Sequence, residues 1–98
     1  MSGEELEREF ESRGIRRGGI LLLAPTDALD LVPSARNARI RILGIDGFRL
    51  LGSAIQPDQE HSVDYTRGPS EVNDPWTAAE MFLRSRMSVD RIFELTLE

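Results

Sequence analysis

The stretch from Asp58 to Asp64 holds the densest group of side chains that could do chemistry. It contains the carboxylates of Asp58, Glu60 and Asp64 together with His61, the only histidine of the chain. Such a group could bind a metal ion, or His61 could act as a general base beside Asp64. In an extended strand, however, His61 and Asp64 point to opposite sides, and a metal site needs three or four convergent ligands. We therefore interpret the stretch as a polar turn that leads into a strand, with His61 hydrogen-bonded locally.

Other motifs of catalysis are absent from the sequence. The chain has no cysteine, which excludes disulfides, thiolate nucleophiles and cysteine-bound zinc. It also has no lysine, which excludes Schiff-base chemistry and the phosphate-binding P-loop. Ser53 lacks the surroundings of a nucleophile elbow, and the glycines do not follow the dinucleotide-binding pattern. We expect no catalytic residue, no metal ligand and no cofactor.

Charge is distributed unevenly along the 98 residues, which carry a net charge of −5. Residues 1–12 hold five glutamates and one arginine, whereas residues 13–49 hold seven arginines and three aspartates. An acidic chain repels phosphate backbones, so we expect no nucleic-acid partner. No apolar run approaches the roughly 20 residues that cross a bilayer, and the acidic start is unlike a secretory signal. These features predict a cytoplasmic protein without a membrane partner.

An acidic helix is predicted at the start of the chain. Ser2 and Glu5 have the spacing of a capping box, while Leu6 and Phe10 lie four residues apart and could dock the helix. A flexible connection follows, up to residue 18. The glutamates of this helix form a solvated face or a surface for a basic partner, and three of them are partner-binding candidates: Glu5, Glu7 and Glu9.

The next part of the chain predicts one strand and one hairpin. Residues 19–24 form an apolar run of strand length, and a short helical turn then ends at Pro33. Asp46-Gly47 suits a type I′ turn, which requires positive φ at both central positions. We therefore predict a hairpin of residues 39–45 with 48–55. The segments around it are predicted as a polar loop at 34–38, a turn at 56–59, a strand at 61–66 and a loop at 67–73.

The clearest helix of the sequence begins at Asp74-Pro75. Asp is a preferred N-cap residue and Pro a preferred first helical residue, and an apolar face continues to about Arg86. Trp76 in the first turn is interpreted as core packing or a lid over a hairpin, with a binding role as the alternative. Residues 91–98 alternate apolar and polar side chains, which predicts a half-buried strand.

Three segments carry a resemblance to a known class of proteins. They are Gly44-Ile45-Asp46-Gly47-Phe48, the run from Gln56 to Tyr65, and Asp74-Pro75-Trp76. In these segments the chain resembles the small immunity proteins of bacterial polymorphic-toxin systems. The resemblance implies a compact α+β domain, often acidic, that binds and neutralises a cognate toxin.

We expect residues 1–98 to form a single α+β domain, with residues 1–18 as acidic helix and connection and 19–98 as core. An antiparallel sheet of four or five short strands would carry the 75–86 helix on one face. The predicted function is a non-catalytic cytoplasmic protein-binding module, an immunity-type inhibitor of a basic toxin. The alternatives are a small hydrolase or metal-dependent enzyme that uses the 58–64 stretch, and a structural homo-oligomer paired through a strand edge. The full set of partner-binding candidates is Glu5, Glu7, Glu9, Asp58, Glu60, His61, Asp64 and Trp76.

Overall fold

The computed structural model describes residues 1–66 and 73–98. Within these ranges the chain forms three α-helices, one 3₁₀-helix and five strands. In chain order these are α1 (Gly3–Glu9), η1 (Glu11–Arg13), β1 (Ile15–Arg17), β2 (Ile20–Leu22), α2 (Pro25–Asn37), β3 (Ile42–Leu51), β4 (Ala54–Asp64), α3 (Pro75–Arg84) and β5 (Ile92–Leu97). The predicted loop at 67–73 lies outside the described residues except for its last residue.

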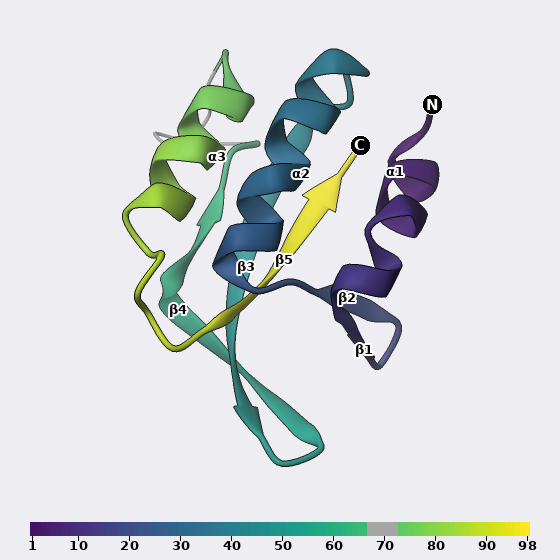
Figure 1. Ribbon diagram of the computed structural model, residues 1–98. Helices are drawn as coiled ribbons and strands as arrows, with labels where there is room; N and C mark the ends of the chain where they lie inside the picture. The colour runs from purple at the N-terminus through teal and green to yellow at the C-terminus, as the bar shows by residue number, and fades with distance from the viewer. Residues whose placement is uncertain (67–72) are drawn as a thin grey trace.

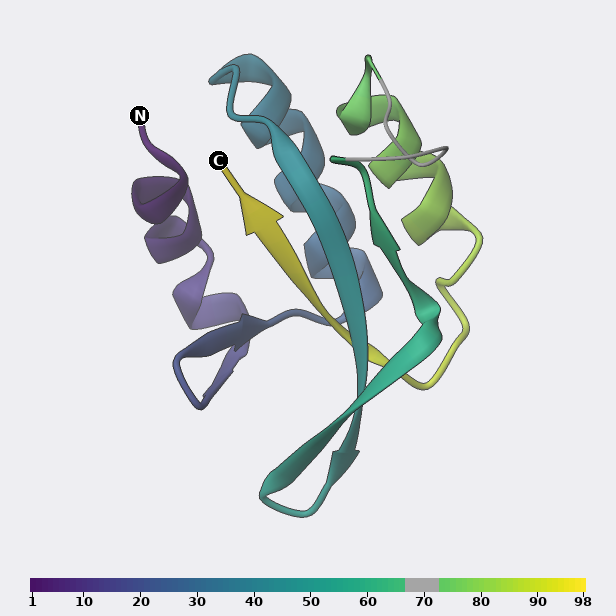
Figure 2. The ribbon, with the colours of Figure 1, turned by 180° about the vertical axis from the view of Figure 1, so that it is seen from behind.

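Two antiparallel sheets form the β layer. β3 lies between β4 and β5 in a three-stranded sheet, and β1 pairs with β2 alone. The sheets meet at one bridge, where Leu23 and Phe93 exchange backbone hydrogen bonds of 2.7 and 2.8 Å. Helices α2 and α3 lie side by side on one face of the three-stranded sheet, and no described helix covers its other face, here called the uncovered face (Figures 1 and 2). The predicted single α+β domain with antiparallel strands is confirmed, although the strands divide into two sheets.

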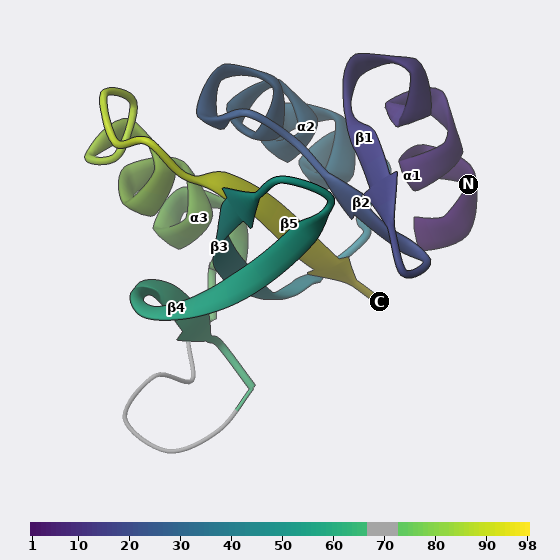
Figure 3. The same cartoon turned by 90° about the horizontal axis from the view of Figure 1, so that it is seen from below.

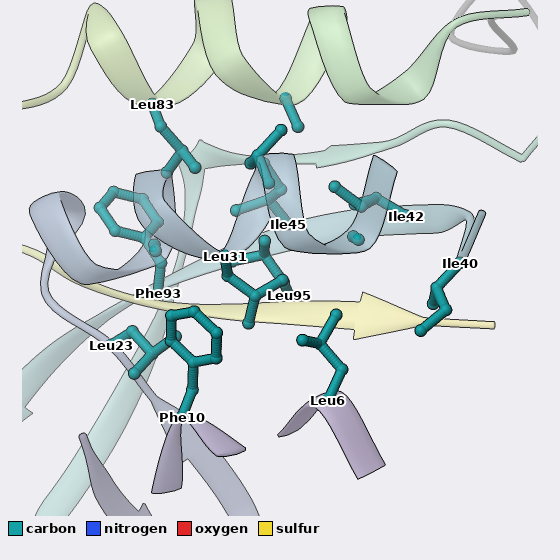
Figure 4. Packing of buried hydrophobic residues seen from close by; sticks show 14 of the residues in the cluster. Leu6, Phe10, Leu23, Leu31, Ile40, Ile42, Ile45, Leu83, Phe93 and Leu95 are labelled. Carbon is teal, nitrogen blue, oxygen red and sulfur yellow. The ribbon is translucent and has the colours of Figure 1, made fainter. Parts of the chain in front are cut away.

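The hydrophobic core fills the space between the three-stranded sheet and the helices. Phe93, Leu95 and Ile45 point from the strands toward α2 and α3, and all three are buried (Figure 4). Leu6 and Phe10 complete the cluster from the side of α1. The prediction that these two residues dock the first helix is therefore confirmed.

Helix α2 corrects the sequence prediction for residues 25–38. The predicted turn ended at Pro33, but Pro33 lies inside a helix of 13 residues and residues 34–37 continue it. A proline within a helix removes one hydrogen bond and costs about 3 kcal/mol. The loss is offset because one face of α2 is buried against the core, at the regular spacing of Ala28, Leu31, Val32 and Ala35. The fold therefore has two helices packed on the sheet rather than the one expected.

The hairpin is also placed differently from the prediction. β3 runs without a break through Asp46 and Gly47, and the chain reverses at Gly52–Ser53, where Gly52 has a φ of 64°. Consecutive positive φ angles, as a type I′ turn requires, occur instead at Gly18 and Gly19, at 57° and 82°. These two glycines join β1 to β2, so this segment is a tight hairpin and not a flexible connection.

β4 contains the region that was predicted as a turn at 56–59. Pro57 lacks an N–H donor, but β4 is the outer strand of the three-stranded sheet, where such a residue is tolerated. Within the strand the register shifts: Gly47 is opposite Asp58, whereas Ile45 is opposite Val63. Residues 59–62 therefore form a bulge opposite Asp46 alone, and this bulge carries most of the polar stretch.

The last two elements agree with the sequence prediction. The Asp74 carboxylate accepts a hydrogen bond of 2.9 Å from the backbone N–H of Thr77, and Pro75 is the first residue of α3. The helix ends at Arg84, two residues earlier than expected. β5 alternates buried and more exposed residues as the pattern predicted, because one face meets the core and the other is the uncovered face.

Candidate functional site

The bulge of β4 is organised by its own polar side chains. The hydroxyl of Ser62 donates to the carbonyl of Asp58 over 2.8 Å and accepts from the backbone N–H of Gly47 over 3.1 Å. The carboxylate of Asp58 accepts from the backbone N–H of Glu60 over 3.1 Å. These bonds replace part of the hydrogen-bond ladder of the sheet, which the bulge interrupts. The side chains of Ser62 and Asp58 therefore stabilise the backbone of the bulge.

Two arginines connect the bulge to the segment between α3 and β5. Arg91 Nε donates to Asp58 Oδ2 over 2.7 Å, and both side chains are only 15% exposed. Because the guanidinium favours the ionised carboxylate, the pKa of Asp58 is held below its usual range. Arg86 donates from Nε to His61 Nδ1 over 3.0 Å, and its guanidinium carbon lies 3.8 Å from the ring centroid of Phe82. Both arginines thus hold residues that were candidates for chemistry.

These contacts decide what the 58–64 stretch is able to do. Nδ1 of His61 accepts from Arg86, and the carboxylate of Asp58 is occupied by Arg91. Among the described residues, Asp64 accepts a hydrogen bond of 2.8 Å from the backbone N–H of Thr66. In the same part of the chain, no three His, Asp or Glu side chains are grouped closely enough to hold a metal ion. Among the described residues, the side chains of Asp58 and His61 therefore support the bulge.

The acidic candidates on α1 have structural partners in two of three cases. Glu5 completes the predicted capping box by accepting from the backbone N–H of Ser2 over 3.0 Å. Glu7 forms an ion pair with Arg16 NH1 at 2.7 Å. Glu9 is exposed and has no ion pair among the described residues. Replacing Glu5 or Glu7 would therefore disturb local structure as well as surface charge.

Trp76 lies where the packing interpretation placed it. Its Nε1–H donates to the carbonyl of Ile40 over 2.8 Å, and the ring packs against the core. This bond fixes the segment after α2 to the first turn of α3. A partly buried aromatic residue with its polar atom satisfied contributes to stability.

The uncovered face contains a hollow that the sequence did not reveal. Its volume is about 390 Å³, and polar groups of three strands surround it. The lining residues are Leu43, Gly44, Asp46, Gln59, Ser62, Val63, Asp64, Thr66 and Thr96. Among the earlier candidates only Asp64 takes part, whereas Asp58 and His61 lie with Arg91 and Arg86, apart from this lining.

Two carboxylates are placed directly opposite each other beside this hollow. Asp46 of β3 pairs with Glu94 of β5, and both face away from the core because Ile45 and Leu95 face toward it. Burial raises the pKa of Glu94, and the negative charges of Asp46 and Glu7 raise it further. Neither Asp46 nor Glu94 has an ion pair or a side-chain hydrogen bond within the described part of the chain. Like charges directly opposite in a sheet are destabilising, so the fold keeps this pair at a cost.

The cost can be measured with Glu94→Gln, which we expect to raise the free energy of unfolding at neutral pH. A pKa raised above the unfolded value of about 4.3 means that ionised Glu94 destabilises the fold. Protonated Glu94 contributes favourably to the free energy of unfolding at pH values below the unfolded pKa. This contribution is lost as pH rises through the folded pKa. Urea midpoints of the two proteins should therefore differ more at about pH 7 than at about pH 4. An equal difference at both pH values would contradict the cause given for the shift.

Sequence reasoning missed Asp46, Glu94 and the two arginines. The sequence prediction placed Asp46 in a turn. It placed Glu94 at a polar position of an alternating strand, but without a partner. Only the register of β3 and β5 brings the two carboxylates together.

Comparison with known proteins does not assign the chain to a family. No protein-family model matches the sequence, and no curated protein matches it. Among the described residues, no helix has the length and apolar character to span a bilayer.

Proposed function

We propose that this chain is a non-catalytic, cytoplasmic protein-binding module that presents its uncovered face to a basic protein, as an immunity-type inhibitor of a basic toxin does. The observation that supports the proposal is the Asp46–Glu94 pair. Two carboxylates stand opposite each other, without a described counter-charge, on a face that no described helix covers (Figure 3).

A cationic side chain of the partner would relieve this repulsion. Placed between Asp46 and Glu94, a guanidinium or ammonium group would balance the negative charge of both carboxylates and donate charge-assisted hydrogen bonds to them. The adjoining hollow offers further acceptors in Gln59 and Thr96. Complementary charge would also speed the encounter of the two proteins.

The 58–64 stretch has a supporting role in this proposal. Asp58 and His61 are engaged by Arg91 and Arg86, and their contacts shape the bulge that borders the hollow. Replacing them would weaken binding by altering the bulge and not by removing a reacting group. The enzyme alternative lacks an observation of this kind.

The test uses the protein that co-purifies with the tagged chain from its native host. Association rate and affinity are measured over a range of ionic strength for the wild type and for the double variant Asp46→Asn/Glu94→Gln. The double variant should bind at least about tenfold more weakly, a loss of roughly 1.4 kcal/mol, and with a flatter salt dependence. Unchanged affinity in the double variant would overturn the proposal.

A matched control removes the same number of charges elsewhere. The double variant Glu4→Gln/Glu9→Gln neutralises two exposed glutamates of α1. It should bind nearly as the wild type does. If this control weakens binding and the sheet variant does not, the partner binds the N-terminal helix instead of the uncovered face.

A further inference from the structure

The β3–β4 hairpin extends beyond the rest of the fold as an arm (Figures 1 and 2). β3 pairs with β5 only as far as Phe48, opposite Ile92, whereas it pairs with β4 as far as Leu51, opposite Ala54. We call residues 49–56 the hairpin arm. A two-stranded ribbon of this kind is marginally stable in water unless another surface covers it.

The arm carries apolar side chains where a solvated hairpin would carry polar ones. Leu50 is 46% exposed and Leu51 is 55% exposed. A groove of about 380 Å³ adjoins them where β3 passes the start of β5. Its lining residues are Ala24, Phe48, Arg49, Leu50, Leu51, Asp90, Arg91 and Ile92.

Two charges of opposite sign line the same groove. Arg49 and Asp90 are both exposed, and neither side chain has an ion pair or hydrogen bond with another described residue. Arg91 is different, because it is held by Asp58. The groove therefore offers an apolar centre with one positive and one negative group that no described side chain pairs.

Such a surface is complementary to itself. In an interface with twofold symmetry, residue i of one copy contacts residue j of the other and the reverse contact is also made. Arg49 of each copy can then pair with Asp90 of the other while Leu50 and Leu51 are covered. This balance matters because a chain of net charge −5 repels a second copy over most of its surface.

We propose that the hairpin arm and its groove form the interface of a symmetric homodimer. The occupant of the groove is a second copy of this chain, bound through Leu50 and Leu51 and aligned by two Arg49–Asp90 pairs. The proposal is independent of the partner bound by the uncovered face, because its test measures only the association of the chain with itself.

Sedimentation velocity over a wide range of protein concentration tests the apolar contact. The wild type should sediment as a dimer, and the variant Leu50→Ser/Leu51→Ser as a monomer with an unchanged circular dichroism spectrum. Met81→Ser/Met87→Ser is the matched control, because these two methionines are 67% and 41% exposed and do not line the groove. The control should remain a dimer. A wild type that stays monomeric, or a dimer that survives both leucine replacements, would overturn the proposal.

Charge exchange tests the symmetry of the interface. Arg49→Asp and Asp90→Arg should each weaken the dimer, because each places like charges opposite each other at both pairs. An equimolar mixture of the two variants should form a heterodimer, since every pair then joins an arginine to an aspartate. The double variant Arg49→Asp/Asp90→Arg should form a homodimer again. If neither the mixture nor the double variant associates, the twofold arrangement is wrong.

Discussion

Phe93→Ala is expected to lower the free energy of unfolding by about 3–5 kcal/mol. Phe93 is completely buried and pairs with Gly47 in the sheet, while its backbone forms the bridge to Leu23. Its ring meets that of Phe82 edge to face, with 6.3 Å between the centroids. The replacement would leave a cavity where two sheets and α3 meet, and none of these elements can move in without breaking backbone hydrogen bonds. A domain of this size is stable by only about 5–15 kcal/mol, so the loss would be a large fraction of the total.

The control is the same replacement at another buried phenylalanine. Phe10 is 8% exposed and lies after the short helix α1, which can shift toward the core and partly fill the space. Phe10→Ala should therefore cost less than Phe93→Ala in denaturant unfolding followed by circular dichroism. Equal losses would mean that Phe93 does not have the central position that its contacts indicate.

The elements that the sequence predicted well have their signals within a few residues. Asp74 and Pro75 mark the start of α3 because the cap needs only the next turn of chain to be satisfied. The alternation around Phe93 marks β5 because one face of that strand is buried along its whole length. Ser2 and Glu5 likewise cap α1 without help from distant residues.

The errors arose where distant contacts override a local signal. Pro33 normally ends a helix, but burial of one face of α2 offsets its cost. Asp46-Gly47 is a favourable turn sequence, yet pairing with both β4 and β5 keeps β3 extended there. Local turn chemistry cannot reveal that a segment has partners on both sides.

The candidate site has the same limitation. The sequence singled out Asp58 and His61, but the arginines that engage them follow 33 and 25 residues later in the chain. The Asp46–Glu94 pair depends on strand register, which no single segment encodes. The sequence therefore indicated that Asp58 and His61 matter, but their roles depend on contacts that form only in the folded chain.

Gly47→Ala is expected to destabilise the protein by about 1–3 kcal/mol, and Gly47→Val by at least as much. A Cβ atom on Gly47 would lie 2.5 Å from the carbonyl oxygen of His61, which belongs to the backbone and can move only if the bulge moves. The type I′ turn predicted from the sequence would also make Gly47→Val unfavourable, by at least about 1 kcal/mol, but because of positive φ. Gly47 is not among the residues with positive φ, so the cause is close approach of two strands.

Asparagine separates these two causes. It is a favoured residue at the positive φ of a type I′ turn, so a turn at Gly47 would tolerate Gly47→Asn. The bulge would not, because asparagine adds the same Cβ, and the urea midpoint should fall at least as far as for Gly47→Ala. Gly18→Asn is the matched control: Gly18 has a φ of 57°, and no described atom beyond its chain neighbours lies within 4 Å of an added Cβ. Its free energy of unfolding should therefore change by less than about 0.5 kcal/mol. If Gly47→Asn is as stable as the wild type, β4 does not approach Gly47 closely, and the bulge that borders the hollow of the uncovered face is not formed as described.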